Sequence, residues 1–255
     1  MKKMCWMKQL KIGRKKLKKN FIFIFYYTLY KRTKMTEFDI ETYLNSLPED
    51  TTEINISWKK LTHLPDLSRF AELKILNCSH NNLTSLPELN KNKNLEMLNC
   101  SYNKLTLLPQ LNENLRELCC YINNLTSLPQ LNGNLRYLYC DHNNLTSLPE
   151  LNKNLCELDC RYNNLTSLPQ LNKNLRRLYC NGCNLTLLPE LNGNLNKLRC
   201  MKNNIPEILF NDGTIYENKR NLINNVAKCR YRIMCLKYKE HFKRWMKRLT
   251  IGKKN

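Results

Sequence analysis

Apolar and polar positions recur with a fixed short period through the middle of the chain. The pattern L-x-x-L-x-C-x-x-N-N-L-T-x-L-P-x-L-N-x-N stands in register in four units, which open at Leu115, Leu135, Leu155 and Leu175. Cys183 replaces the first Asn of the pair in one of them. A unit of twenty residues cannot bury its apolar side alone, so its neighbours must cover it. The pattern therefore predicts a solenoid.

Within each unit the pattern predicts two different sides. The apolar residues of L-x-x-L-x-C alternate, which predicts a short strand with one buried face. Strands stacked in parallel lie about 4.7–4.9 Å apart, so each Leu and Cys should lie beside its equivalent in the next unit. The return segment carries Pro129, Pro149 and Pro169. Proline fixes φ and removes a donor, so this side is predicted to be extended, with too little chain for a full helix.

A recurring Asn follows each predicted strand, where the chain turns away from the sheet. Its amide can satisfy backbone groups that the turn would leave without partners. Cys183 takes this place in one unit, and Lys59 takes it in the degenerate first unit. The ladder positions occupied by Asn are Asn81, Asn103, Asn123, Asn143, Asn163 and Asn203.

The unit resembles the leucine-rich repeat, whose core pattern is L-x-x-L-x-L-x-x-N/C-x-L. In this chain the pattern stands as Leu135-x-x-Leu138-x-Cys140-x-x-Asn143-x-Leu145. The resemblance implies an α/β horseshoe, a right-handed solenoid with a parallel sheet on its concave face, an extended convex face and helical caps. The repeat length is similar to that of the short class found in bacterial effector and large-DNA-virus proteins.

The resemblance divides the chain into four parts. The leucine-rich-repeat solenoid is predicted over residues 51–205, as about seven repeats and a truncated one. The repeats that open at Thr51 and Leu73 are twenty-two residues long. Residues 35–50 are predicted to form an N-terminal helical cap, and residues 206–255 a C-terminal cap with a basic amphipathic helix. Residues 1–34 form a basic tail.

The N-terminal cap is predicted as a helix over Thr36–Ser46, with Thr36 as its N-cap. In the C-terminal segment an apolar stripe from Ile223 to Leu249 recurs at helical spacing beside a basic face. Two interpretations of residues 228–250 stay open. The stripe seals the last repeat, or the helix binds an acidic surface.

Charge is concentrated at the two ends. Residues 1–34 hold twelve Lys or Arg and no acid, and residues 228–255 hold eleven with one acid. The net charge of +21 therefore belongs to the tails, and the repeats between them are nearly neutral. Basic tails predict attraction to an acidic protein, to nucleic acid or to an acidic membrane surface, and a solvated tail is the alternative. The apolar run at residues 21–30 is too short to span a bilayer as a helix.

The cysteines occupy a buried place in the repeat. Free Cys behaves as a small apolar residue, so we predict a reduced column in a reducing compartment, the cytoplasm, with the nucleus as the alternative. Cys180 and Cys183 have a redox or zinc spacing, but we interpret them as two repeat positions, because no second pair completes a zinc site. We expect no cofactor and no metal. The column is Cys78, Cys100, Cys120, Cys140, Cys160, Cys180 and Cys200.

Residues between the buried Leu and Cys should line the concave face, because the faces of a strand alternate. These positions vary freely, with aromatic residues in the centre and basic residues toward the C-terminal end, whereas the buried positions barely vary. Tyr, Trp and Arg are enriched at binding hot spots, so the face predicts protein recognition, and unconstrained drift is the alternative. The candidate residues are Trp58, His80, Tyr102, Tyr121, Tyr137, Tyr139, Tyr162, Arg176, Arg177, Tyr179 and Arg199.

No catalytic constellation is visible in the sequence. The four His residues pair with no nucleophile in a known motif. Asp141 and His142 are expected to point to opposite sides or to lie on a turn. The favoured hypothesis is therefore a monomeric, non-enzymatic module that binds another protein on its concave face, aided by its basic tails.

Two alternatives remain. The first is a polyanion binder, which attaches to nucleic acid or an acidic membrane through residues 1–34 and 228–255. The second is an adaptor for a ubiquitin-ligase-type complex. Effectors with similar repeats carry a large ligase domain after them, whereas about fifty residues follow the repeats here, too few for a catalytic domain of ordinary size.

Overall fold

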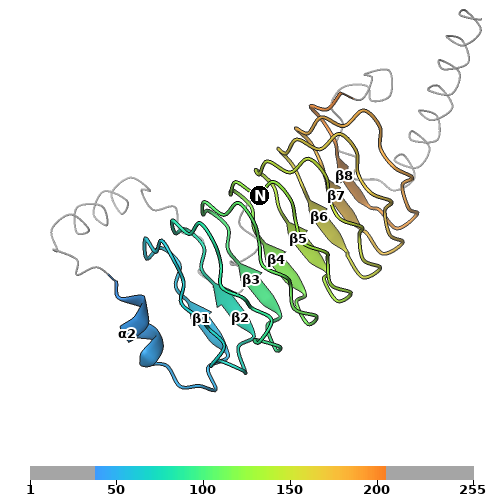
Figure 1. Ribbon diagram of the computed structural model, residues 1–255. Helices are drawn as coiled ribbons and strands as arrows, with labels where there is room; N and C mark the ends of the chain where they lie inside the picture. Colours follow the sequence, from blue (N-terminus) through green and yellow to red (C-terminus); the bar gives the residue numbers. More distant parts are fainter. Residues whose placement is uncertain (1–37, 205–255) are drawn as a thin grey trace, which may run out of the picture.

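The predicted solenoid is present in the computed structural model, which describes residues 38–204. Eight strands lie in one parallel sheet, in the order in which they occur along the chain (Figure 1). The strands are β1 (Glu53–Asn55), β2 (Ile75–Asn77), β3 (Met97–Asn99), β4 (Glu117–Cys119), β5 (Tyr137–Tyr139), β6 (Glu157–Asp159), β7 (Arg177–Tyr179) and β8 (Lys197–Arg199).

The register of the sheet follows the sequence repeat. The central residue of each strand pairs with the central residue of the next, as Ile54 does with Leu76 and Leu138 with Leu158. The first pair is separated by the longer repeat and the second by the ordinary one, yet both keep the same alignment. The extra residues of the longer repeats are therefore accommodated outside the strands.

The core is a continuous stack of equivalent side chains. Leu135, Leu138, Cys140 and Leu145 of one repeat are fully buried, and their counterparts in neighbouring turns join the same cluster. The inward position of the cysteines is confirmed, since the column from Cys78 to Cys180 consists of buried free thiols. Burial raises the pKa of the Cys78 thiol to about 12, as expected for a neutral core group.

The return side of each turn is extended, as predicted. Between β5 and β6 the chain forms turns, bends and extended segments without a helix. Adjacent return segments are joined by backbone hydrogen bonds, such as the one that the Asn144 N–H donates to the Leu125 carbonyl at 2.9 Å. The extended chain therefore continues the stacking on the side opposite the sheet.

Among the described residues, one short helix, α2 (Ile40–Asn45), precedes β1 (Figure 1). The sequence predicted a helix over Thr36–Ser46 with Thr36 as its N-cap, and this start is wrong. Asp39 is the N-cap, because its carboxylate accepts two backbone N–H groups of the first turn at 3.0 and 3.3 Å. Thr36 itself lies outside the described residues.

Contacts with the first turns hold α2 in place. Ile40 and Leu44 are buried in the core cluster. Arg69 donates hydrogen bonds to the carbonyl oxygens of Leu44 and Leu47, the second at 3.3 Å. The apolar face of α2 thus packs against the turns that carry β1 and β2.

Residues 1–37 and 205–255 lie outside the described part of the chain. The basic tail over 1–34 and the C-terminal cap with its amphipathic helix therefore stay predictions, as do the four domain boundaries. Within residues 38–204, no helix is long and apolar enough to cross a membrane.

Candidate functional site

The first and third residues of each strand flank a buried central residue, and we call the side of the sheet that carries them the concave face. Five candidate residues stand at these places and are half-buried, namely Tyr137, Tyr139, Arg177, Tyr179 and Arg199. The other six lie just before or after the strands, and all eleven keep some surface exposed. The six are Trp58, His80, Tyr102, Tyr121, Tyr162 and Arg176.

The residue before each ladder position has a left-handed backbone. Its φ is 61° at Trp58 and 52° at Tyr162, values that residues other than glycine rarely adopt. Repetition in all eight described turns means that the turn imposes this conformation. It also ends the alternation of the strand, so the side chain no longer follows the in-and-out pattern. This left-handed column consists of Trp58, His80, Tyr102, Ile122, His142, Tyr162, Gly182 and Lys202.

Aromatic rings stack along the N-terminal half of the left-handed column. The ring of Trp58 lies 3.8 Å from that of His80, which lies 4.0 Å from that of Tyr102. Tyr121 meets Tyr102 edge-on, with ring centroids 5.5 Å apart. Burial lowers the pKa of His80, which favours a neutral ring within the stack. The sequence placed the aromatic cluster in the centre, whereas the longest stack lies toward the N-terminal end.

A second ring contact lies farther along the column. The rings of His142 and Tyr162 are 4.4 Å apart. A Cβ atom at Gly182 would lie 2.6 Å from Cδ1 of Tyr162. Glycine at this place therefore makes room for the tyrosine ring.

Two ion pairs lie in the C-terminal half of the concave face, one between neighbouring strands and one within a single turn. The carboxylate of Glu157 accepts from the guanidinium of Arg177 on the next strand at 2.6 Å. Asp159 pairs with Arg161, with 2.7 Å between Oδ1 and Nε. The sequence analysis did not predict these pairs. A usable signal was present, because Glu157 and Arg177 are one repeat apart and share a strand position.

Asp141 and His142 meet where the chain bends after β5, so of the two expectations the turn is correct and the opposite orientation is wrong. Nδ1 of His142 lies 2.7 Å from Oδ2 of Asp141. The left-handed φ of 55° at His142 brings the two side chains together. Burial, aided by the negative charge of Asp159, raises the pKa of Asp141. No third metal-binding residue joins this pair, and residues 38–204 contain no group of three or more His, Cys, Asp or Glu that could hold a metal ion.

Tyr179 lies between two guanidinium groups at the C-terminal end of the face. The guanidinium carbons of Arg161 and Arg199 are 5.6 and 5.8 Å from its ring centroid, within the range of cation–π contact. Nearby in the sheet, the buried Nε of Arg199 and the buried Oδ1 of Asn181 have no hydrogen-bond partner among the described residues. One is a donor and the other an acceptor, and both atoms are enclosed by neighbouring groups.

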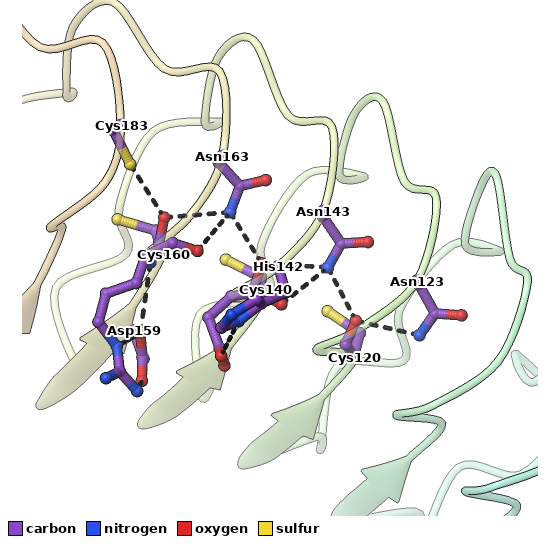
Figure 2. A network of polar contacts seen from close by, with 11 residues as sticks. Cys120, Asn123, Cys140, His142, Asn143, Asp159, Cys160, Asn163 and Cys183 are labelled. Atoms are coloured by element: carbon purple, nitrogen blue, oxygen red, sulfur yellow. Dashed lines mark hydrogen bonds and ion pairs between the residues drawn. The ribbon is translucent and has the colours of Figure 1, made fainter.

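The predicted asparagine ladder connects successive turns (Figure 2). Nδ2 of Asn143 donates to the carbonyl oxygens of Cys120 and Cys140 at 3.0 and 3.1 Å. Its Oδ1 accepts the Leu125 N–H at 3.0 Å. The ladder therefore satisfies backbone groups of two turns at once, as expected from its place after the strand.

Two further ladders on the return side were missed. In the L-N-x-N segment, Nδ2 of Asn152 donates to the Asn132 carbonyl at 2.8 Å, and Nδ2 of Asn154 donates to the Gly133 carbonyl at 2.7 Å. Equivalent bonds recur along the solenoid. The signal was the constancy of both Asn residues in exposed or half-exposed chain, where a merely solvated residue would be free to vary.

Two segments of the chain match models of this repeat. Residues 71–113 match a model described as Leucine Rich repeats (2 copies), and residues 134–155 match one described as Leucine Rich Repeat. No curated protein sequence matches the chain.

Solved structures with a similar fold include three bacterial proteins. YopM from Yersinia enterocolitica WA-314 is 34% identical with a TM-score of 0.53, over 64% of this chain and 40% of that chain. YopM from Yersinia pestis, a leucine-rich effector protein, is 31% identical with a TM-score of 0.59, over 62% and 45%. A Shigella effector LRR domain is 28% identical with a TM-score of 0.55, over 66% and 77%.

The present chain matches less than half the length of either YopM chain. The likeness to these structures is one of fold, and the two family models match segments of the repeat itself. The described solenoid is therefore built of leucine-rich repeats of the short class, similar to those of bacterial effector proteins.

Proposed function

We propose that this chain is a non-enzymatic protein-interaction module whose partner lies across the concave face. The leucine-rich-repeat fold is typical of such modules. The observation that carries the proposal is a contrast between positions. The buried places keep Leu and Cys from turn to turn, whereas the concave face and the left-handed column carry varied Tyr, Trp, His and Arg side chains, which are enriched at interfaces.

The N-terminal half of the face supports this proposal with exposed aromatic surface. Trp58 is 71% exposed and Tyr102 is 38% exposed, although both belong to the stack. Stacked rings have little rotamer freedom left to lose when a partner binds. The stack thus offers apolar contact area at a low cost in conformational entropy.

The C-terminal half supports it with polar groups that lack partners. The Nε donor of Arg199 and the Oδ1 acceptor of Asn181 are buried without partners among the described residues. A partner could supply these bonds only after the surrounding side chains move, because both atoms are enclosed. The basic tails would add attraction to an acidic partner. The buried free thiols favour a reducing compartment such as the cytoplasm.

The test is recovery of partner proteins from a cell lysate by the full chain and by two double variants. Tyr139→Ala with Tyr179→Ala removes two aromatic side chains from the concave face. Leu107→Ala with Leu187→Ala removes two apolar side chains from the return side, where they are 60% and 42% exposed. We expect the first variant to lose a specific partner by about tenfold or more, because hot-spot residues each contribute a kcal/mol or more. The second variant should match the unsubstituted chain.

Circular dichroism and thermal unfolding of both variants establish that they are folded. Equal recovery with the Tyr139 and Tyr179 variant would contradict the proposal. Recovery of nucleic acid or acidic lipid alone, with a steep loss at high salt, would move the function to the basic tails.

A further inference from the structure

One interior rung of the asparagine ladder is a cysteine. At the preceding rung, Nδ2 of Asn163 donates to the carbonyl oxygens of Cys140 and Cys160, both at 3.0 Å. Its Oδ1 accepts the Leu145 N–H, also at 3.0 Å. A thiol has a single hydrogen, so Cys183 cannot repeat this arrangement. Its Sγ instead donates to the Cys160 carbonyl at 3.3 Å (Figure 2).

The substitution brings two thiols together. The side chain of Cys183 points toward Cys160 of the preceding turn (Figure 2), and its Sγ lies 3.3 Å from the Cys160 carbonyl oxygen. The Cys160 thiol donates to the Tyr179 carbonyl at 3.5 Å. Cys160 belongs to the core column and is fully buried, and Cys183 is 4% exposed. The pair therefore joins a core position of one turn to a ladder position of the next.

Cys183 is the thiol of the pair that ionises more readily. The adjacent Cys160 side chain lowers the pKa of the Cys183 thiol, and backbone groups of Asn163 and Leu165 act in the same direction against the effect of burial. In contrast, burial raises the pKa of column thiols such as Cys120. The thiolate is the nucleophilic form of cysteine, so Cys183 is the reacting group and Cys160 the resolving one.

We propose that Cys160 and Cys183 are an oxidisable pair, which closes into a disulfide between successive turns when a peroxide is present. The Cys183 thiolate attacks one peroxide oxygen, the O–O bond breaks, and water leaves once the departing oxygen takes a proton. Cys183 is then a sulfenic acid. The Cys160 sulfur attacks the Cys183 sulfur, the S–S bond forms, and a second water leaves. Two thiols are oxidised, and one peroxide is reduced to two waters.

The cysteine at position 183 is also expected to let peroxide reach the buried pair, because it holds adjacent turns together less firmly than asparagine does. Asn163 fastens its turn with several hydrogen bonds, whereas Cys183 offers fewer bonds at the equivalent place. Local opening of the solenoid is expected to begin where fewer bonds hold adjacent turns. A disulfide there would fasten the turns of β6 and β7, and would fix Tyr179 relative to its neighbours. The inference is independent of what binds the concave face.

The experiment treats the full chain with hydrogen peroxide, blocks the remaining thiols with iodoacetamide and maps the peptides by tandem mass spectrometry. We expect a cross-linked product that has lost two hydrogens, with the linkage at Cys160 and Cys183. Cys183→Asn should abolish it, and this variant should fold because it restores the ladder residue. Cys156→Ala should retain it, because the half-buried Cys156 is a sequence neighbour of Cys160 that takes no part.

Four results would overturn the proposal. The cross-link could persist in Cys183→Asn, or fragmentation could place it between Cys180 and Cys183. Alternatively, Cys160 and Cys183 could both carry the alkyl label after Cys156 has been fully oxidised. Circular dichroism of the peroxide-treated chain distinguishes a linked native solenoid from unfolded, cross-linked material, and the latter also counts against the proposal.

Discussion

Asn143 shows how one residue type serves two turns of this solenoid. Its amide hydrogens reach carbonyl oxygens of its own turn and of the preceding one, while its Oδ1 accepts an N–H from the preceding turn. Asn144, the next residue, has an exposed side chain. Two adjacent residues of the same type therefore have different energetic roles, because only one faces the interior of the turn.

We predict that Asn143→Ala lowers the free energy of unfolding by about 3 kcal/mol, because buried carbonyl and N–H groups lose their partners. Asn144→Ala is the matched control and should change it by less than about 0.5 kcal/mol, as expected for an exposed position. Urea unfolding of both variants measures the difference. Equal effects would mean that the ladder amide makes no special contribution.

Asp141 makes the stability of the folded state depend on pH. Its pKa is raised by burial and by the nearby charge of Asp159, so the folded state binds a proton more tightly than the unfolded state does. The ionised carboxylate therefore reduces stability above the folded pKa. This penalty is relieved as the pH falls toward the ordinary value of 3.8.

We predict that the stability of Asp141→Asn relative to the unsubstituted chain improves as the pH rises from about 4 to about 5.5. The measurement is the difference in thermal midpoint between the two proteins at each pH. Comparing two pH values cancels any constant loss from the altered contact with His142. A variant that becomes less stable relative to the unsubstituted chain as the pH rises would contradict the prediction.

At the scale of secondary-structure elements, the strands are short because the backbone conformation of a nearby residue ends each of them. The strands are three residues long, and the left-handed residue that follows each of them turns the chain out of the sheet. That same residue carries the stacked rings of Trp58 and His80. The spacing of parallel strands, about 4.7–4.9 Å, brings equivalent rings within stacking range. The element that ends the strand thus also presents the aromatic surface.

The helix α2 depends on its N-cap. Asp39→Ala should loosen the first turn, because the carboxylate that accepts its free backbone N–H groups is lost. We predict faster amide exchange at Glu41 and Thr42, measured by hydrogen-exchange NMR, with little change in β4 or β5. Glu49→Ala, in the exposed segment after the helix, is the control. Unchanged exchange in the Asp39 variant would show that packing alone holds the helix.

At the scale of the whole molecule, each turn of the solenoid is stabilised by the turns on either side of it. Each strand of the described sheet is hydrogen-bonded to the strands beside it in sequence order, so a defect acts first on adjacent turns. The core has the same linear form, with one cluster running from α2 to β8. An interior strand such as β5 contacts two neighbouring strands, whereas β8 contacts only β7 within the described sheet. A defect in an interior strand therefore affects two neighbours, and a defect in β8 affects one.

We predict that Leu138→Ala in β5 lowers the free energy of unfolding by about 3 kcal/mol, because it leaves a cavity in the fully buried core. Hydrogen exchange should then accelerate in β4 and β6 as well as in β5. The matched variant Leu198→Ala in β8 should accelerate exchange in β7 and leave β4 unaffected. Uniform acceleration along the solenoid in both variants would indicate one cooperative unit instead of a linear stack.

The agreement between sequence and structure is uneven for physical reasons. Buried Leu and Cys positions recur because the interior of every turn has the same shape, so a single period predicts strands, register and core. Contacts between exposed side chains depend on backbone conformations that the period does not report. The bond between Asp141 and His142 illustrates this, because a left-handed residue cancels the alternation on which the prediction relied.

The sequence by itself determined the repeat, its inward column of thiols and the place of the asparagine ladder, because identical units can bury their apolar sides only by stacking in register. Only the tertiary structure decided which candidates meet. It brought Trp58, His80 and Tyr102 into one stack and placed the Cys183 thiol against Cys160. These contacts join different turns, and their geometry follows from strand spacing and a left-handed φ together, which no single repeat contains.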